Sequence, residues 1–234
     1  NNTATGNSAL YANTTGIYNS AFGAGALSSN TTGSYNTAAG AGALSSSNGD
    51  DNRAFGYFSL YSNTTGAANT AIGSNALYAN TTGIGNTAAG KFSLTSNTTG
   101  AYNSAFGNAT LPLNTTGSFN TAIGNNALYT NTTGNKNVAV GNSALTSNTI
   151  GFENTAAGYE TLLANQGGQS NTATGAYALR LSVNGNSNTA TGTNALYNNT
   201  SSYNTATGAA ALFTNTSGYR NSASGNRSMY LNTT

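Results

Sequence analysis

The sequence has no cysteine, no histidine and no tryptophan, and one of its 234 residues is proline. Without cysteine there are no disulfides and no thiolate metal sites, and cysteine usage says nothing of the redox compartment. Without histidine the chain lacks the commonest general base and the commonest metal ligand. We therefore expect no catalytic residues, no metal and no cofactor, and the sequence predicts a protein that is not an enzyme.

Charge is also scarce, since charged residues make up 4% of the chain, with six Lys or Arg and four Asp or Glu. The cations are scattered singly and form no basic stripe interleaved with aromatic residues, so nucleic acid is not an expected partner. No apolar run approaches the roughly 18 residues of a membrane-spanning helix, so we expect no membrane insertion in this segment.

A tandem repeat is what the sequence does contain. The stretch "NTAIGSNALYANTTGIG" at residues 69–85 is followed at once by "NTAAGKFSLTSNTTGAY" at 86–102. Of the thirteen spacings between repeat starts, eleven are 17 residues and two are 16. The repeats start at Asn2, Asn19, Asn36, Asn52, Asn69, Asn86, Asn103, Asn120, Asn137, Asn154, Asn171, Asn188, Asn204 and Asn221.

The repeat predicts an all-β fold. A 17-residue unit is too short for a pair of helices, and its Gly and Asn-Thr-Thr-Gly segments break helices. It fits one coil of a parallel β-solenoid (β-roll), which we predict as two short strands joined by two turns. About fourteen coils would form one repetitive domain over residues 1–234, and we expect a piece of a longer fibre because both ends fall inside the pattern.

Columns of the repeat that do not vary are interpreted as structural. Ala and Leu suit a narrow interior, the first Gly suits a corner with positive φ or close backbone approach, and Asn-Thr-Thr-Gly suits a second corner. A column of Asn side chains can form an amide ladder from coil to coil. In the coil that starts at residue 69, this structural ladder comprises Asn69, Ala71, Gly73, Leu77, Asn80 and Gly83.

The column after the invariant Ala changes its chemistry along the chain. It is apolar in the middle coils, for example Phe55, Ile72 and Val140, and hydroxylic in the last four, from Thr174 to Ser224. Because each coil contributes few apolar side chains, a single chain would bury little surface. We therefore expect self-association, with one face of each coil packed on identical neighbours in a homotrimer or filament.

Aromatic residues form partial columns, one directly after the Leu. Exposed Tyr offers contact area at small entropy cost, so this column is a candidate surface for a glycan or a host-surface ligand. Stacking that covers the coil edges is the simpler interpretation. The candidate residues are Tyr11, Tyr61, Tyr78, Tyr129 and Tyr197, and a second aromatic column contains Tyr18, Tyr35, Tyr102, Phe119 and Tyr203.

The carboxylates and the Asn-Thr-Thr/Ser triplets are the remaining candidates. Glu153 with Glu160 would suit a two-carboxylate glycosidase, and Asp50 with Asp51 a Ca²⁺ site, but we favour solvated side chains for both pairs. Ten triplets are formal glycosylation acceptors, and we favour a turn-capping role for their Asn side chains. These are Asn13, Asn30, Asn63, Asn80, Asn97, Asn114, Asn131, Asn199, Asn215 and Asn232.

The motif N-T-A-x-G-x-x-A-L resembles the head repeats of trimeric autotransporter adhesins, the YadA-like family, which read approximately Ser-Val-Ala-Ile-Gly before a small-residue turn. In "NVAVGNSAL" at 137–145, Val138, Ala139, Val140 and Gly141 match that pattern. The resemblance implies a left-handed β-roll of three chains side by side, displayed outside the cell and used for attachment. The chain departs from the family in its longer repeat, its usual Thr in place of Val and its extra Asn-Thr-Thr-Gly.

The expected function is a structural and adhesive segment of an extracellular fibre, a rigid rod of stacked repeats at the cell surface. One alternative is an ice-binding solenoid that uses Thr-x-Thr arrays, which occur at 3–5, 172–174, 189–191 and 205–207. Another is the shaft of a phage tail fibre on a virion, because a cell-surface adhesin and a phage fibre both need a stiff rod.

Overall fold

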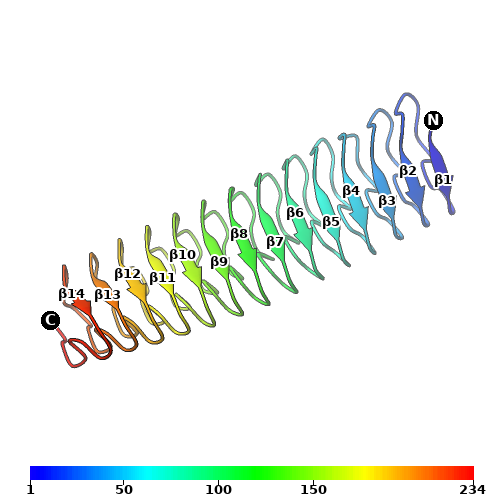
Figure 1. Ribbon diagram of the computed structural model, residues 1–234. Coiled ribbons are helices and arrows are strands. Elements are labelled where there is room, and N and C mark those ends of the chain that lie inside the picture. Colours follow the sequence, from blue (N-terminus) through cyan, green and yellow to red (C-terminus); the bar gives the residue numbers. More distant parts are fainter. The chain divides into compact units, whose positions relative to one another are not determined.

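The computed structural model describes residues 1–234. It confirms the predicted fold class, because the chain is an all-β parallel β-solenoid in which each repeat forms one coil with one strand and no helix occurs (Figure 1). The residues group into two compact units, Asn1–Ser118 and Phe119–Thr234, which are described separately. The single domain, the longer fibre and the left-handed winding stay predictions.

The first unit contains seven strands of three residues. They are β1 (Thr3–Thr5), β2 (Ser20–Phe22), β3 (Thr37–Ala39), β4 (Arg53–Phe55), β5 (Thr70–Ile72), β6 (Thr87–Ala89) and β7 (Ser104–Phe106). Each strand pairs in parallel with the next strand in the sequence, and equivalent columns align. Ala71, for example, lies between Ala54 and Ala88.

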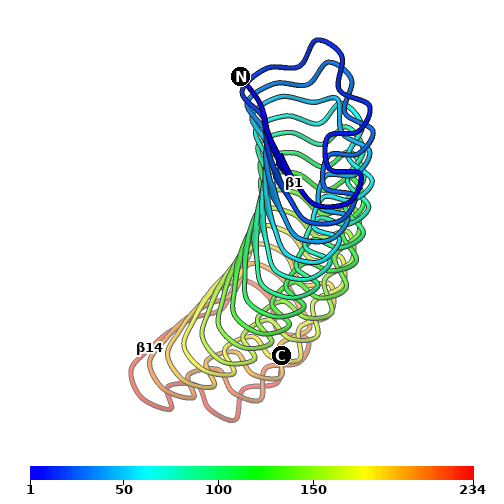
Figure 2. The same ribbon diagram turned by 90° about the vertical axis from the view of Figure 1, so that its right-hand side faces the viewer.

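The second unit repeats this arrangement with seven more strands. They are β8 (Thr121–Ile123), β9 (Val138–Val140), β10 (Thr155–Ala157), β11 (Thr172–Thr174), β12 (Thr189–Thr191), β13 (Thr205–Thr207) and β14 (Ser222–Ser224). Pairing is again parallel and in register. Within this unit, each coil overlies its predecessor (Figure 2).

The core of each unit is a column of Ala and Leu, as predicted. In the coil of β5, Ala71, Ala76 and Leu77 have no solvent-exposed surface. The strand alternates, so its middle Ala points inward while its first and third residues point outward. Met229, which replaces the Leu in the last coil, is exposed.

The first corner requires glycine for two reasons, both anticipated from the sequence. Gly73 has φ of +125°, a conformation that side-chain-bearing residues rarely adopt. A Cβ atom added there would lie 2.8 Å from the backbone carbonyl carbon of Gly90 in the next coil. The backbones of consecutive coils therefore approach too closely at this corner for any side chain.

The prediction of two strands per coil is wrong, because each coil contains one strand and the segment after the corner is a turn. In this turn Asn75 and Leu77 have φ of +57° and +52°. Left-handed conformation costs a non-glycine residue about 1–2 kcal/mol. At Leu77 this cost is offset because the side chain is fully buried and the amide donates to the carbonyl oxygen of Ser93 at 3.0 Å.

The second corner is the Asn-Thr-Thr-Gly segment, in agreement with the prediction. The backbone amides of Thr81, Thr82 and Gly83 all donate to the carbonyl oxygen of Thr98 in the next coil, at 2.9, 3.2 and 3.3 Å. One acceptor thus satisfies three consecutive donors. This arrangement fixes the turn of each coil on the turn of the following coil.

Two ladders of Asn side chains run along each unit and confirm the predicted amide ladder. In the first ladder, Asn69 Nδ2 donates to the carbonyl oxygen of Gly83 at 2.8 Å and to Asn52 Oδ1 at 3.2 Å. In the second, Asn80 Nδ2 donates to Asn63 Oδ1 at 2.7 Å and to the same Gly83 carbonyl at 3.1 Å. The carbonyl oxygen of Gly83 therefore joins the two ladders, and all of these Asn side chains are buried.

The second ladder is interrupted twice by serine, once in each unit. Ser47 and Ser182 occupy the Asn column, and both are fully buried. The preceding rung has no donor for its side-chain oxygen, because Asn30 Oδ1 and Asn165 Oδ1 have no hydrogen-bond partner. The shorter serine side chain therefore leaves a buried acceptor without a partner on the rung before it.

Candidate functional site

An exposed apolar surface lies along the outward face of the strands. In the first unit it contains Phe22, Phe55, Ile72 and Phe106, each the last residue of its strand and more than a third exposed. In the second unit, Ile123, Val138 and Val140 are exposed in the same way on β8 and β9. Strand alternation directs these side chains outward because the inward position of each strand is Ala. These exposed apolar side chains make the strand face a candidate interaction surface.

The same face is hydroxylic in the last four coils of the second unit. Each of β11 to β14 has an exposed hydroxyl residue on both sides of a buried Ala. The pairing places Thr172 beside Thr189, which is followed by Thr205 and Ser222 in register. The result is a regular two-column array of hydroxyl groups.

The aromatic column after the Leu stacks in part. The rings of Tyr61 and Tyr78 are parallel within 4°, with centroids 5.4 Å apart, and Tyr197 stacks on Phe213 at 5.1 Å. Tyr11 stays 83% exposed. Of the five tyrosines predicted as a binding surface, which also include the exposed Tyr129, the structure brings Tyr61 and Tyr78 together in consecutive coils. A binding role for these five residues stays a prediction.

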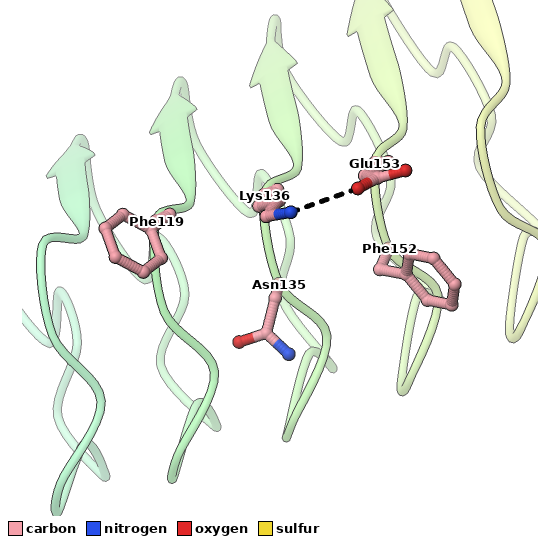
Figure 3. Close-up of a pocket in the computed structure, with 5 residues that line it drawn as sticks. All are labelled: Phe119, Asn135, Lys136, Phe152 and Glu153. Carbon is pink, nitrogen blue, oxygen red and sulfur yellow. Dashed lines mark hydrogen bonds and ion pairs between the residues drawn. The ribbon is translucent and has the colours of Figure 1, made fainter.

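A hollow of about 330 Å³ lies on a different edge of the second unit, lined by Phe119, Asn135, Lys136, Phe152 and Glu153 (Figure 3). Phe119, Lys136 and Glu153 hold the last column of three consecutive repeats, which orders them along the edge. Asn135 and Phe152 hold the column before it. The two rings lie on either side of the Asn135 side chain (Figure 3).

An ion pair closes one side of this hollow. Lys136 Nζ lies 3.2 Å from Glu153 Oε1, and the two side chains are 63% and 46% exposed. This pair was not predicted from the sequence. The spacing does indicate it, because residues that are one repeat apart fall in neighbouring coils on the same edge. Phe119 was recognised as a member of an aromatic column, whereas Asn135 and Phe152 were not singled out.

A second ion pair forms a more enclosed cluster. Arg180 Nε donates to Glu160 Oε2 at 2.7 Å, and Arg180 Nη1 donates to the hydroxyl of Tyr197 at 3.1 Å. The hydrogen bond from Arg180 holds the pKa of the Glu160 carboxyl below its ordinary value. The hydrogen bond with Glu160 raises the pKa of the Tyr159 hydroxyl. The guanidinium also lies 5.8 Å from the ring centroid of Tyr177.

The acidic residues that we considered for catalysis or metal binding take part in separate interactions. Glu153 pairs with Lys136 and Glu160 pairs with Arg180, so the two glutamates belong to separate ion pairs. Asp50 Oδ1 accepts a hydrogen bond from the backbone amide of Ser34 at 2.7 Å. No group of three or more His, Cys, Asp or Glu side chains comes together. None of the chain's segments is a helix that could cross a membrane.

The Asn residues of the glycosylation triplets lie in the second ladder. In the middle coils, Asn63, Asn80 and Asn97 have no exposed surface, and their Nδ2 atoms donate within the ladder. A glycan attached to Nδ2 needs solvent around it, and its attachment replaces one of the two N–H groups of the side-chain amide. The folded coil thus favours the structural interpretation of this column, as expected.

The segment that carries the resemblance to YadA-like head repeats is an ordinary coil of the second unit. Val138, Ala139 and Val140 form β9, with the Ala buried and both Val exposed. Gly141 has φ of +135° at the corner. The family itself stays a prediction from the motif. No protein-family model, no curated protein and no solved structure matches the chain.

Proposed function

We propose that the chain is a structural and adhesive segment of an extracellular fibre at a cell surface. The observation that supports this most directly is the pair of Asn ladders, which hydrogen-bond consecutive coils in each unit through fully buried amides. Buried hydrogen-bonded side chains in the interior coils resist local opening. A protein that bears load between a surface and a ligand needs this resistance along its length.

The exposed apolar strand face supports self-association into a homotrimer with chains side by side. Burying the exposed part of a Phe or Ile side chain contributes about 1 kcal/mol. The first unit presents Phe22, Phe55, Ile72 and Phe106 on this face, so each chain gains about 4 kcal/mol from these side chains alone. Identical chains aligned in parallel place each apolar coil beside the same coil of a neighbour.

Sedimentation equilibrium tests the association. We expect a trimer at micromolar concentration, and a shift towards monomer when Phe55 and Phe106 are both replaced by Ser, the residue that Ser224 provides in this column. Tyr11→Ser removes an exposed ring from a different column and serves as the control. A wild-type chain that sediments as a monomer at this concentration contradicts the proposed assembly.

Attachment is tested with beads coated with the 234-residue chain. We expect such beads to adhere to cells or to immobilised glycans more strongly than beads coated with an unrelated protein of similar charge. Equal retention of the two kinds of bead on every surface contradicts the adhesive role and leaves a purely structural fibre.

Ice binding is a second candidate, favoured by one observation. All eight outward residues of β11 to β14 are exposed hydroxyl residues aligned in register. Rows about 4.8 Å apart present hydroxyl groups at spacings near those of water in ice. The test is thermal hysteresis, which should disappear in Thr174→Phe/Thr191→Phe because Phe55 shows that this column accepts a ring. Absence of hysteresis in the wild-type chain rules this candidate out.

A further inference from the structure

We propose that Tyr18 and Tyr35, the N-terminal tyrosine pair, form a modification site at which a peroxidase with hydrogen peroxide couples the two phenol rings into dityrosine. The two residues hold the last column of consecutive repeats in the first unit. Their rings are stacked, with centroids 5.3 Å apart and an interplanar angle of 20°. The product is a covalent link between two coils of one chain, which needs no ligand and no cell surface.

The backbone places the two rings side by side. The amide of Tyr35 donates to the carbonyl oxygen of Ile17 at 3.0 Å, so the two coils are hydrogen-bonded directly beside the pair. Tyr18 and Tyr35 have the same left-handed conformation, with φ of +58° and +61°. Because these conformations match and neighbouring rungs lie about 4.8 Å apart, both side chains leave the edge in the same direction. The phenols therefore meet in the folded chain without any rearrangement of the backbone.

Both rings are accessible to an oxidant and have room to turn. Tyr18 and Tyr35 are 53% and 52% exposed. Coupling joins the ring edges, so the rings must turn out of the stack about their side-chain torsions. The terminal torsion of tyrosine is broad, and exposed side chains change rotamer within nanoseconds. The stack therefore keeps the rings within reach of each other and does not block this turn.

The composition of the chain directs oxidation to tyrosine. Cysteine and methionine are readily oxidised in proteins, and tryptophan and histidine react with oxidants as well. This chain has no Cys, Trp or His and a single Met, but it has 14 Tyr. Phenols are therefore its main oxidisable groups, and the placement of their rings decides which of them couple.

Other pairs of tyrosine rings are less suited to coupling. Tyr61 and Tyr78 also stack, but the ring of Phe58 packs against both, with centroids 4.7 and 6.2 Å away. Both of these tyrosines are also only partly exposed. Tyr159 and Tyr177 meet edge to face, at 87°, so the edge of one ring is directed at the face of the other. The N-terminal tyrosine pair should therefore couple more readily than either.

The coupling consumes one molecule of hydrogen peroxide and removes two hydrogen atoms from the pair. The peroxidase takes one electron and the phenolic proton from each tyrosine, and the peroxide is reduced to two molecules of water. The two tyrosyl radicals then form a carbon–carbon bond between the Cε atoms of Tyr18 and Tyr35, which are ortho to the phenolic oxygens. The hydrogen on each of these carbons moves to the phenolic oxygen, so both hydroxyl groups are restored.

The link closes a loop of one 17-residue repeat. Covalent links stabilise a fold by restricting the unfolded chain, as disulfides do. This chain has no cysteine and forms no disulfide. Dityrosine would therefore provide the covalent link that its composition otherwise denies it.

Peptide mapping tests the proposal on the 234-residue chain after treatment with a haem peroxidase and hydrogen peroxide. Trypsin cleaves the denatured chain first after Arg53 and next after Lys91, so the N-terminal tyrosine pair falls in the peptide 1–53 and the other stacked pair of the first unit in 54–91. We expect the peptide 1–53 to lose the mass of two hydrogen atoms. Tandem mass spectrometry should then release no fragments from cleavage between the two tyrosines, and the blue fluorescence of dityrosine should appear.

Tyr35→Phe is the decisive variant, because it keeps the ring and removes one of the two phenols. We expect the mass loss of the peptide 1–53 to vanish and the fluorescence to fall. Tyr11→Phe is the matched control, since it removes a phenol that is 83% exposed from the same peptide but from a different column. This control should leave the link in place. A circular-dichroism melt of both variants ensures that a lost link is not lost folding.

Each outcome decides the proposal. Peroxidase treatment that leaves the mass of the peptide 1–53 unchanged overturns it, and so does a link that persists in Tyr35→Phe or disappears in Tyr11→Phe. Covalent dimers on a denaturing gel, with the peptide 1–53 unmodified, would show that tyrosines couple between chains and not within one. A link that forms in the peptide 54–91 before any forms in 1–53 would show that exposure and freedom to turn do not select the pair.

Discussion

Replacing Ser182 with Asn should repair the interrupted ladder and stabilise the second unit. In the intact ladder an Asn at this position donates to the Asn oxygen of the preceding coil, as Asn165 Nδ2 does to Asn148 Oδ1 at 2.8 Å. The new amide would reach Asn165 Oδ1, which is buried and has no partner. It would also donate to the carbonyl oxygen of Gly185, as Asn165 does to Gly168 at 3.2 Å.

The expected change in the free energy of unfolding follows from the unpaired acceptor, Asn165 Oδ1. A buried acceptor without a partner costs about 1–3 kcal/mol, and ordering the Asn side chain costs up to about 1 kcal/mol. The serine hydroxyl at this position also has no partner, so its removal loses no hydrogen bond. We expect Ser182→Asn to raise the free energy of unfolding by about 1–2 kcal/mol, which raises Tm by about 2–8 °C for a protein of this size.

The assay is a thermal melt followed by circular dichroism, with Ser147→Asn as the control. Ser147 lies in the same unit one column before the ladder, in a position where Asn198 occurs naturally, so this substitution adds the same side chain without adding a rung. A Tm of Ser182→Asn that equals the Tm of Ser147→Asn would refute the reasoning, because it would mean that Asn165 Oδ1 is satisfied in another way.

Three further changes probe the ladder, the corner and the enclosed ion pair. Asn97→Ser should lower the free energy of unfolding by about 1–3 kcal/mol in a denaturant titration, because it orphans the acceptor of the rung before it; an unchanged midpoint contradicts this. Gly73→Ala should cost about 2–4 kcal/mol through strain and steric clash, and more than Gly225→Ala, which has positive φ but no atom within 4 Å. Equal losses for the two would show that only φ matters. The carboxyl of Glu160 has a lowered pKa, so its contribution of up to about 1 kcal/mol is present above its unfolded pKa of 4.5 and is lost as pH falls through its folded pKa. This acid-dependent loss, measured by melts between pH 7 and pH 2, should be smaller in Glu160→Gln.

The interior of the coil was predictable from the sequence because every copy meets the same neighbours. A column such as that of Ala71 or Gly73 is in contact with its own equivalents in the coils before and after it, so the same geometric constraint recurs from coil to coil within each unit. This shared constraint explains why the Asn, Ala, Gly and Leu columns vary so little from coil to coil. Their burial and the amide ladders follow from it.

The number of strands was not predictable in this way. The error arose at Leu77, whose φ of +52° contradicts the ordinary preference of leucine. Only the buried environment of this side chain and its hydrogen bond to the next coil stabilise the left-handed turn. Local propensity carries no information about either contact, so the segment resembled a second strand.

The hollow of the second unit could not be predicted from the sequence, for a different reason. Column arithmetic identifies the pair of Lys136 and Glu153, since 153 − 136 = 17, but the hollow also needs the ring of Phe152 one column earlier than that of Phe119. The two rings belong to repeats that start at Asn103 and Asn137, and the side chain of Asn135, from the repeat between them, lies between the rings (Figure 3). Such a displacement has no signature in a consensus, because both columns vary freely.

The fold therefore depends on one set of columns of the repeat, and the proposed association and binding depend on another. The buried columns are nearly uniform, whereas the outward columns vary. The outward residues of β4 are Arg53 and Phe55 and the last outward residue of β12 is Thr191, yet both strands have three residues and a buried central Ala. Substitutions in the outward columns should change the Tm of the dissociated chain by no more than about 1–2 °C. They should change association or binding, because these side chains belong to neither ladder nor core. A coil whose fold depends on so few positions leaves its remaining positions free to present different surfaces along one chain.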